Sequence, residues 1–252
     1  KVFDQNGKLT RTIGVPGGAY QGAYQPERMV SPRGLTVAFG DQLWVTEECR
    51  NPKRALAWNL KTGKVIREKL GCPPYGASGG SFDRQNLRQW IGQRCLWDVD
   101  VKKQDAKIKS ILQKNGGHLG GLIPWCMGYR FHHQGGRNFL IGRGKAAIIS
   151  ELMPDGTLKD LALISSGHSF LYALGWKDVP EFRKAFEKKY PKADPKKKYG
   201  NKEWRYAGVL WIDQNGDGLL QADEFEIGDP NTKFGGFGWG PLFYDLTMRV
   251  PY

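Results

Sequence analysis

A strand–turn–strand pattern that returns along the chain is the feature that most limits its fold. Apolar, strand-like runs flank a short polar turn at four places, centred on Gly7, Gly63, a position near Asp105, and Gly156. The successive intervals are 56, about 42 and about 51 residues. Repetition of an all-β unit at this length favours sheets arranged radially over a two-sheet sandwich.

The clearest repeating unit spans Ser31 to Gly71, where β-branched and aromatic runs alternate with Gly, Pro and Asp. Such punctuation predicts short antiparallel strands joined by tight turns. The predicted strands cover residues 35–39, 42–48, 55–60 and 64–70. A second full unit is predicted from Cys126 to Ile164. Four strands in about 40 residues is the size of one β-propeller blade, so we expect an all-β fold of four-stranded blades.

One segment interrupts the β pattern. Asp178 is the predicted helix N-cap, and Phe182, Phe186 and Tyr190 then recur at helical spacing. We therefore expect a helical, Lys-rich insertion at about 178–204, placed between two strands of one blade.

The order of motifs in the first 71 residues is GKLTRTIGVPGG, SPRGLTV, GDQLWVTEE and RALAWNL, and it resembles NHL repeats. The likeness is good over residues 1–71, weaker to about 175, and absent from the final 75. It implies a β-propeller of the bacterial, secreted NHL type, usually with six blades. Only four or five blade equivalents are present, so residues 1–252 are expected to form a single propeller domain or the C-terminal part of one. In the second case, upstream blades or another chain would complete the ring.

The segment WIDQNGDGLLQADEF, from Trp211 to Phe225, carries the strongest site motif. It satisfies every fixed position of D-x-[DN]-x-[DN]-G-x5-E, a loop that surrounds Ca²⁺ with oxygen atoms. The predicted ligands are Asp213, Asn215, Asp217, the backbone carbonyl of Leu219, Gln221 and Glu224, with Gly218 at the sharp turn. The loop resembles those of EF-hand and dockerin modules.

The residues around this loop differ from those families, because YAGVLWI at 206–212 reads as a strand. We therefore expect a structural Ca²⁺ rather than a helix–loop–helix sensor, and the alternative is a metal-free solvated turn. The same DQNG tetrapeptide occurs at Asp4 to Gly7, but Lys8 follows it. That copy predicts a plain hairpin turn.

Histidines supply a second candidate site. His118, His132, His133 and His168 fall in three different repeat units, and neutral imidazole suits Zn²⁺ or Cu²⁺. Some NHL-type lyases bind zinc through histidines at the central channel, and the resemblance implies that arrangement here. The alternative is a set of separate surface or hydrogen-bonded histidines. Glu47, at a predicted strand end, is a candidate acid, base or metal ligand, and its alternative is a solvated or Arg-paired loop.

Tryptophans lie in Gly-rich loops at Trp125, Trp176 and Trp239. They are candidates for a sugar-stacking platform, and the alternative is packing between blades.

Charge and composition narrow the function. The net charge is +13 with a pI near 9.6, and ten Lys/Arg against three Asp/Glu lie between Arg183 and Arg205. This balance favours acidic partners such as polyanionic glycans. Signatures of RRM, KH and helix–turn–helix domains are not seen, so nucleic acid is disfavoured. No Walker loop, G-x-S-x-G, H-E-x-x-H or CxxC motif occurs.

Two functional hypotheses remain. The first is a calcium-stabilised propeller, extracellular or periplasmic, that binds an acidic polysaccharide or a protein partner. The four cysteines permit disulfides, and no apolar run is long enough for a transmembrane segment. The second is a metal-dependent lyase or lactone/ester hydrolase that uses the histidines.

Overall fold

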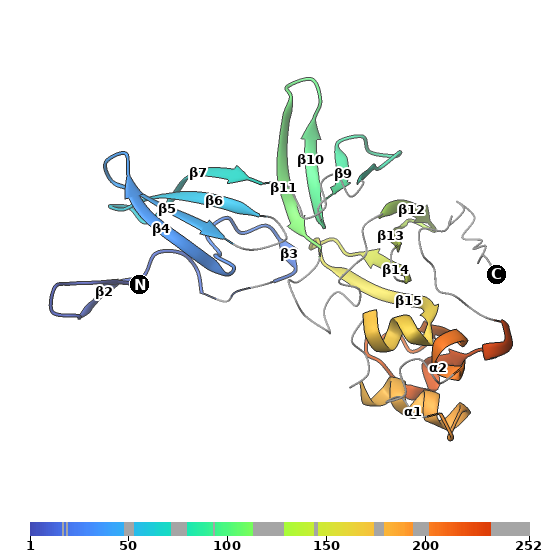
Figure 1. Cartoon of the computed structure of the whole chain (residues 1–252). Helices are drawn as coiled ribbons and strands as arrows, with labels where there is room; N and C mark the ends of the chain where they lie inside the picture. Colours follow the sequence, from blue (N-terminus) through green and yellow to red (C-terminus); the bar gives the residue numbers. More distant parts are fainter. Residues whose placement is uncertain are drawn as a thin grey trace.

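The computed structural model describes residues 1–16, 18, 20–47, 53–71, 80–92, 94–112, 129–143, 146–173, 179–193 and 202–232. Nearly half of these residues lie in β-strands, which pair antiparallel and far outnumber the helical residues, and this confirms the all-β prediction (Figure 1). Four separate sheets follow one another, and among the described strands they do not close into a barrel or a propeller ring. The described strands therefore follow one another in antiparallel order, and the propeller ring stays a prediction.

The first sheet is a hairpin of β1 (Val2–Phe3) and β2 (Leu9–Arg11). Its turn contains the first DQNG. The Oδ1 atom of Asp4 accepts hydrogen bonds from the backbone N–H groups of Asn6 and Lys8, both at 2.9 Å. Gly7 adopts a φ of 79°. This copy of the tetrapeptide forms a hairpin turn, as predicted.

The four-stranded sheet matches the first predicted unit and has the consecutive order β4-β5-β6-β7. Its strands are β4 (Pro32–Ala38), β5 (Gln42–Glu47), β6 (Arg54–Asn59) and β7 (Val65–Leu70). Phe39, predicted as a strand end, instead lies in the turn with a φ of 52°. Leu56 and Trp58 on the central strand β6 are fully buried and form the core of this sheet.

The five-stranded sheet has the order β3-β11-β10-β9-β8. Its strands are β3 (Gly22–Ala23), β8 (Gly80–Phe82), β9 (Gln89–Gly92), β10 (Cys95–Asp100) and β11 (Asp105–Ile111). The β10–β11 hairpin is the one predicted around Asp105. Strand β3 pairs with β11, although all four strands of the other sheet, β4 to β7, lie between them in the sequence. Hairpin patterns do not predict such a long-range pairing.

The six-stranded sheet contains the second predicted unit and runs in consecutive order from β12 to β17. Its strands are β12 (Arg130–Gln134), β13 (Arg137–Arg143), β14 (Ala147–Leu152), β15 (Leu158–Ser166), β16 (Gly208–Ile212) and β17 (Phe225–Ile227). The expectation of four strands in every blade is wrong for this sheet. Strands β16 and β17 extend it because Val209 and Trp211 of β16, both fully buried, pack into the same core as β15.

The helical insertion lies between the paired strands β15 and β16, as predicted (Figure 1). It comprises a π-helical turn η1 (Ser169–Ala173), α1 (Pro180–Lys189) and α2 (Lys202–Tyr206). Two short 3-10 turns follow, η3 (Ala222–Glu224) and η4 (Pro230–Thr232). Helical structure thus begins before residue 178, and the N-cap of α1 is Val179 rather than Asp178, because the helix begins directly at Pro180. Asp178 itself lies outside the described residues.

Aromatic packing fixes α1 to α2. Phe182 and Phe186 are fully buried, and the ring of Phe186 stacks on Trp204 with centroids 3.6 Å apart. Phe182 also lies 5.6 Å from the ring of Phe225 on β17. The two phenylalanines, at the predicted i, i+4 spacing, therefore lie on the buried face of α1. Through Phe182 this face packs the insertion against the last strand of the sheet.

None of the helices within the described ranges is both long enough and apolar enough to span a membrane.

Candidate metal centre

The predicted calcium loop connects β16 to β17 across residues 213–224. Two glycines allow its tight course, with φ values of 76° at Gly216 and 72° at Gly218. Both values lie in the left-handed region that glycine adopts without a Cβ penalty. Gly218 therefore makes the sharp turn expected at position 6 of the loop.

The side chain of Asp217 organises the middle of the loop. Its Oδ1 accepts the N–H of Leu219 at 2.7 Å, and its Oδ2 accepts amide N–H groups of Asn215 and Gln221 at 3.0 and 2.8 Å. The Leu219 N–H holds the pKa of Asp217 below its ordinary value, and the two amides act in the same direction. Asp217 is therefore a carboxylate that the loop itself keeps ionised.

Glu224 anchors the end of the loop and is only 5% exposed. Its Oε1 accepts the N–H of Gln214 at 2.9 Å, while its Oε2 accepts Trp211 Nε1–H at 3.0 Å and the Gln221 N–H at 3.3 Å. A carboxylate has about four acceptor sites, so three donors leave capacity for a cation. Glu224 is thus positioned by β16 and the loop backbone together.

One buried carboxylate oxygen in the loop, Asp213 Oδ1, has no donor among the described residues. The Gln221 side chain accepts the Glu224 N–H in a capping box. The Asp213 side chain is 0% exposed. Its other oxygen, Oδ2, accepts the Gly218 N–H at 3.1 Å and lies 4.0 Å from Lys159 Nζ. A buried acceptor without a donor costs about 1–3 kcal/mol, and a hard cation is one group that would satisfy Asp213 Oδ1.

These residues fit a calcium ion in type. Five side chains and one backbone carbonyl supply oxygen atoms, and Ca²⁺ takes six to eight hard oxygen ligands. In the conformation described, the loop's own N–H groups occupy much of Asp217 and Glu224, and His, Cys, Asp and Glu do not gather into a metal-type group of three among the residues described. Occupancy of the loop would therefore require these hydrogen bonds to be shared with the ion.

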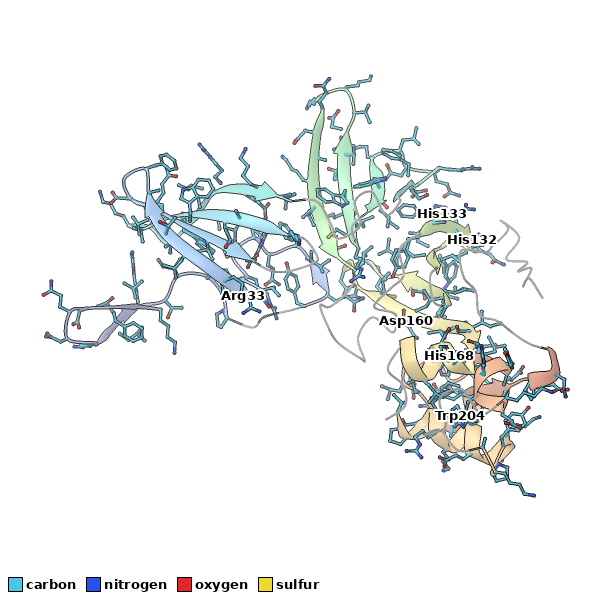
Figure 2. The ribbon with its side chains drawn as sticks, in the orientation of Figure 1. Arg33, His132, His133, Asp160, His168 and Trp204 are labelled. Carbon is cyan, nitrogen blue, oxygen red and sulfur yellow. The ribbon has the colours of Figure 1, made fainter. Side chains whose placement is uncertain are left out.

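The histidines are not brought to one place. His132 and His133 lie on β12, while His168 follows the end of β15 beside the helical insertion (Figure 2). Strand register connects His132 to Lys159 at the other end of β15. Three strand spacings of about 4.8 Å separate His132 from Lys159, and from there β15 runs seven residues of about 3.3 Å each to Ser166, two residues before His168. The described histidines therefore do not form a joint metal site, and His118 lies outside the described residues.

His133 instead joins two sheets. Its Nε2 lies 2.7 Å from Asp83 Oδ1, just after β8, and its Nδ1 lies 2.8 Å from Asn138 Oδ1. Asp83 is only 3% exposed. The sequence contains no spacing signal for a pair 50 residues apart, which explains why sequence reasoning missed this contact.

Glu47 is buried in an ion pair with Arg54, which also hydrogen-bonds the hydroxyl of Tyr24 at 2.6 Å. Tyr24 in turn donates to Glu68. Burial and the Glu68 carboxylate raise the pKa of Tyr24. Burial acts to lower the pKa of Arg54, but hydrogen bonds and charge from Glu47 and Tyr24 raise it overall. Glu47 therefore has an arginine partner, which is one of the alternatives to a role as acid, base or metal ligand.

The three candidate sugar-stacking residues, Trp125, Trp176 and Trp239, lie outside the described residues, as does the Lys-rich run 196–198.

Comparison with known proteins gives no family assignment: no protein-family model matches the chain, and no curated protein matches it. The NHL resemblance therefore stays a prediction carried by the motifs of residues 1–71.

Proposed function

We propose that the protein is a calcium-stabilised β-propeller of the NHL type that acts outside the cytoplasm as a binding module for an acidic polysaccharide or a protein partner. The observation that carries the calcium proposal is the buried, donorless oxygen Asp213 Oδ1. It occupies position 1 of a loop whose sequence satisfies every fixed position of the calcium motif.

The bound ion would be structural. Asp213, Asn215, Asp217, Leu219, Gln221 and Glu224 would hold it, and it would supply positive charge to acceptors that the fold buries. The loop ends in η3 and β17, and both contact α1. An ion bound in the loop would thus stabilise the contacts between α1 and the end of the sheet. This favours a structural role for the ion over that of a switch.

The propeller proposal is supported by strand order. The four-, five- and six-stranded sheets each contain a meander of sequential antiparallel strands, as blades do. The binding proposal is supported by the net charge of +13, which favours acidic partners. Sites of this ligand type bind Ca²⁺ at 10⁻⁴–10⁻³ M in extracellular modules, a range matched to calcium-rich surroundings.

Thermal unfolding tests the calcium site. At a Ca²⁺ concentration about ten times the Kd, binding adds about 1.4 kcal/mol to the stability of the folded state. For a chain of this size we expect Tm to rise by about 3–6 °C over its value in EGTA. Asp213→Asn should abolish the difference. Asp4→Asn is the matched control, because it alters the other DQNG, and it should retain the full calcium effect.

Terbium luminescence gives an independent readout. The Trp211 indole lies 3.0 Å from Glu224, so excitation of tryptophan should sensitise Tb³⁺ in the loop, and Ca²⁺ should displace it. Equal Tm values in Ca²⁺ and EGTA, together with no sensitised emission, would refute the calcium proposal.

A further inference from the structure

A lysine from another strand contacts the calcium-type loop. Lys159, the second residue of β15, donates a hydrogen bond to the backbone carbonyl of Gly216 at 2.5 Å. Its Nζ atom also lies 4.0 Å from Oδ2 of Asp213. Gly216 is at position 4 of the loop, which is not a ligand position in this motif. Lys159 is therefore tied to an atom outside the predicted ligand set, while its charge acts on the first predicted ligand.

Strand pairing brings Lys159 to this place. The N–H of Asp213 donates to the Leu161 carbonyl at 2.9 Å, so the start of the loop is still held against β15. On its other side, Lys159 is paired in register with Glu151 of β14. Glu151 already accepts two hydrogen bonds from Arg137, at 2.9 and 2.6 Å. The carboxylate opposite Lys159 thus has another cationic partner, and the ammonium group of Lys159 contacts the loop.

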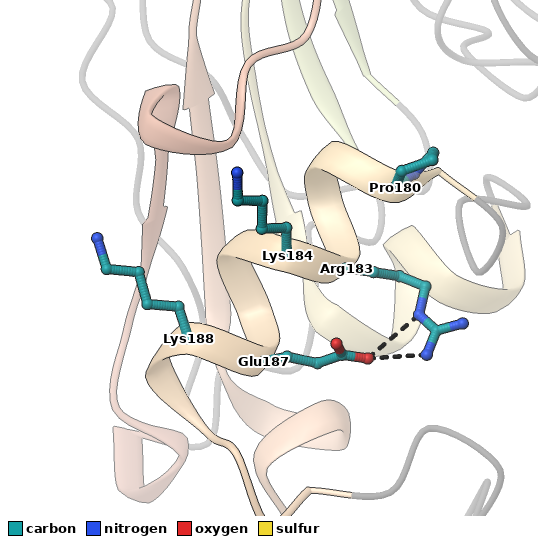
Figure 3. A pocket seen from close by; sticks show the side chains of 5 residues that line it. All are labelled: Pro180, Arg183, Lys184, Glu187 and Lys188. Atoms are coloured by element: carbon teal, nitrogen blue, oxygen red, sulfur yellow. Dashed lines mark hydrogen bonds and ion pairs between the residues drawn. The ribbon is translucent and has the colours of Figure 1, made fainter.

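Burial separates this contact from an ordinary surface ion pair. The side chain of Asp213 is 0% exposed and that of Lys159 is 34% exposed. In the surface pair of Arg183 and Glu187 on α1, the carboxylate is 46% exposed (Figure 3). Water and salt screen such exposed pairs, whereas a charge beside a buried carboxylate is screened much less. The charge of Lys159 therefore has a larger effect on Asp213 than a surface lysine would have.

The same charge reaches the middle of the loop. The hydrogen bond from the Leu219 N–H is the largest cause of the lowered pKa of Asp217, and the charge of Lys159 acts in the same direction. With Glu224, the loop holds three carboxylates as predicted ligands. An ammonium group among them offsets their mutual repulsion, and it also repels any divalent cation that approaches the same oxygens.

We propose that Lys159 is a tethered cation that balances the carboxylates of the calcium loop, so that it stabilises the loop at low calcium and lowers its affinity for Ca²⁺. The inference rests on the proposed function in one respect, the calcium site at 213–224, and it assigns control of that site to a residue of β15.

Titration calorimetry with CaCl₂ at about 0.15 M salt tests the affinity. Lys159→Met removes the charge, and we expect it to lower the Kd for Ca²⁺ about tenfold, or about 1.4 kcal/mol. Lys159→Arg keeps the charge and should stay within about threefold of the native Kd. Lys107→Met is the matched control, because it removes the same charge from an exposed pair with Asp105. It should change the Kd less than about twofold.

Thermal unfolding supplies a second readout. In EGTA, Lys159→Met should have a lower Tm than the native protein, because the carboxylates lose a balancing charge. At a Ca²⁺ concentration well above both Kd values, this difference should shrink or change sign, because the variant binds the ion more tightly. A lysine with a merely structural role would lower Tm equally in both conditions. Lys159→Gln keeps a donor for the Gly216 carbonyl without the charge, and it should bind Ca²⁺ as tightly as Lys159→Met.

The outcomes separate this inference from the calcium proposal. Native protein that binds Ca²⁺, with no tighter binding in Lys159→Met and Lys159→Gln, would overturn the role of Lys159 alone. A Tm difference that is the same in Ca²⁺ and EGTA, or an equal gain of affinity in Lys107→Met, would overturn it too. Binding by Lys159→Met but not by the native protein would support the role of Lys159 and contradict a structural Ca²⁺ in the native protein. Absence of binding in both proteins would refute the calcium site, and the inference with it.

Discussion

The buried pair of Glu47 and Arg54 gives the sharpest stability prediction. The Arg54 side chain is 3% exposed and that of Glu47 is 0% exposed. Replacement of Arg54 by Met leaves the Glu47 carboxylate in the interior without its cationic partner. Breaking a buried ion pair by removing one member costs about 3–5 kcal/mol, because the remaining charge is desolvated and unpaired.

Local contacts place the expected loss near the lower end of this range. Glu47 Oε1 still accepts the Val30 N–H at 2.5 Å, which keeps one stabilising donor in place. Glu68, the second carboxylate near Arg54, is 25% exposed and can be hydrated. We therefore expect Arg54→Met to lower the free energy of unfolding by about 3 kcal/mol.

Urea unfolding followed by tryptophan fluorescence measures this loss, since Trp44 and Trp58 lie in the same sheet. Adding Glu47→Gln to Arg54→Met should recover part of the stability by removing the unpaired charge. Lys61→Met is the control, because its pair with Asp41 is exposed, and it should give no resolvable loss. A loss below about 1 kcal/mol in Arg54→Met, or no recovery in the double variant, would refute the reasoning.

Two further predictions use other parts of the fold. Gly156 and Gly7 have nearly equal φ values of 80° and 79°, but a Cβ at Gly156 would lie 2.7 Å from the Cβ of Ser110, whereas nothing lies within 4 Å at Gly7. Gly156→Ala should therefore cost about 2–4 kcal/mol in urea unfolding and Gly7→Ala about 1–2 kcal/mol; equal losses would show that the turn does not pack on β11. Arg137 holds the pKa of Glu151 below its ordinary value through a hydrogen bond. The resulting stability is present above the ordinary glutamate pKa and is lost as pH falls through the lowered value. Arg137→Met should have a lower Tm than the native protein at about pH 7, and this difference in Tm should disappear towards about pH 3. A difference that does not change with pH would contradict this assignment.

The sequence predicted local β structure well. The strands at 42–47 and 65–70 lie within a residue or two of their predicted ranges, and the helix that buries Phe182 and Phe186 lies inside the predicted insertion. Each of these signals is a property of neighbouring residues, namely alternation, turn chemistry or helical spacing. The calcium motif belongs to the same class, because its six ligand positions fall within twelve residues.

Contacts between distant segments were not predictable in this way. Nothing in the sequence around Asp83 points to His133. For Glu47 the sequence left open whether the carboxylate meets solvent or an arginine, and it did not identify Arg54 as the partner. The separation of His132 from His168 likewise follows from strand register, which depends on how three intervening loops place four strands.

The amino-acid sequence by itself determined the all-β class, the hairpins, the inserted helix and the loop with calcium-type spacing, because period, turn residues and ligand spacing act over a few residues. Only the tertiary structure decided which sheets gain extra strands, where Glu47 and His133 find their partners, and that the edge strands β8 and β12 of two sheets come into contact. Those outcomes depend on burial and on pairing between segments far apart in the chain, where hydration, charge and packing are set by neighbours that no local pattern specifies.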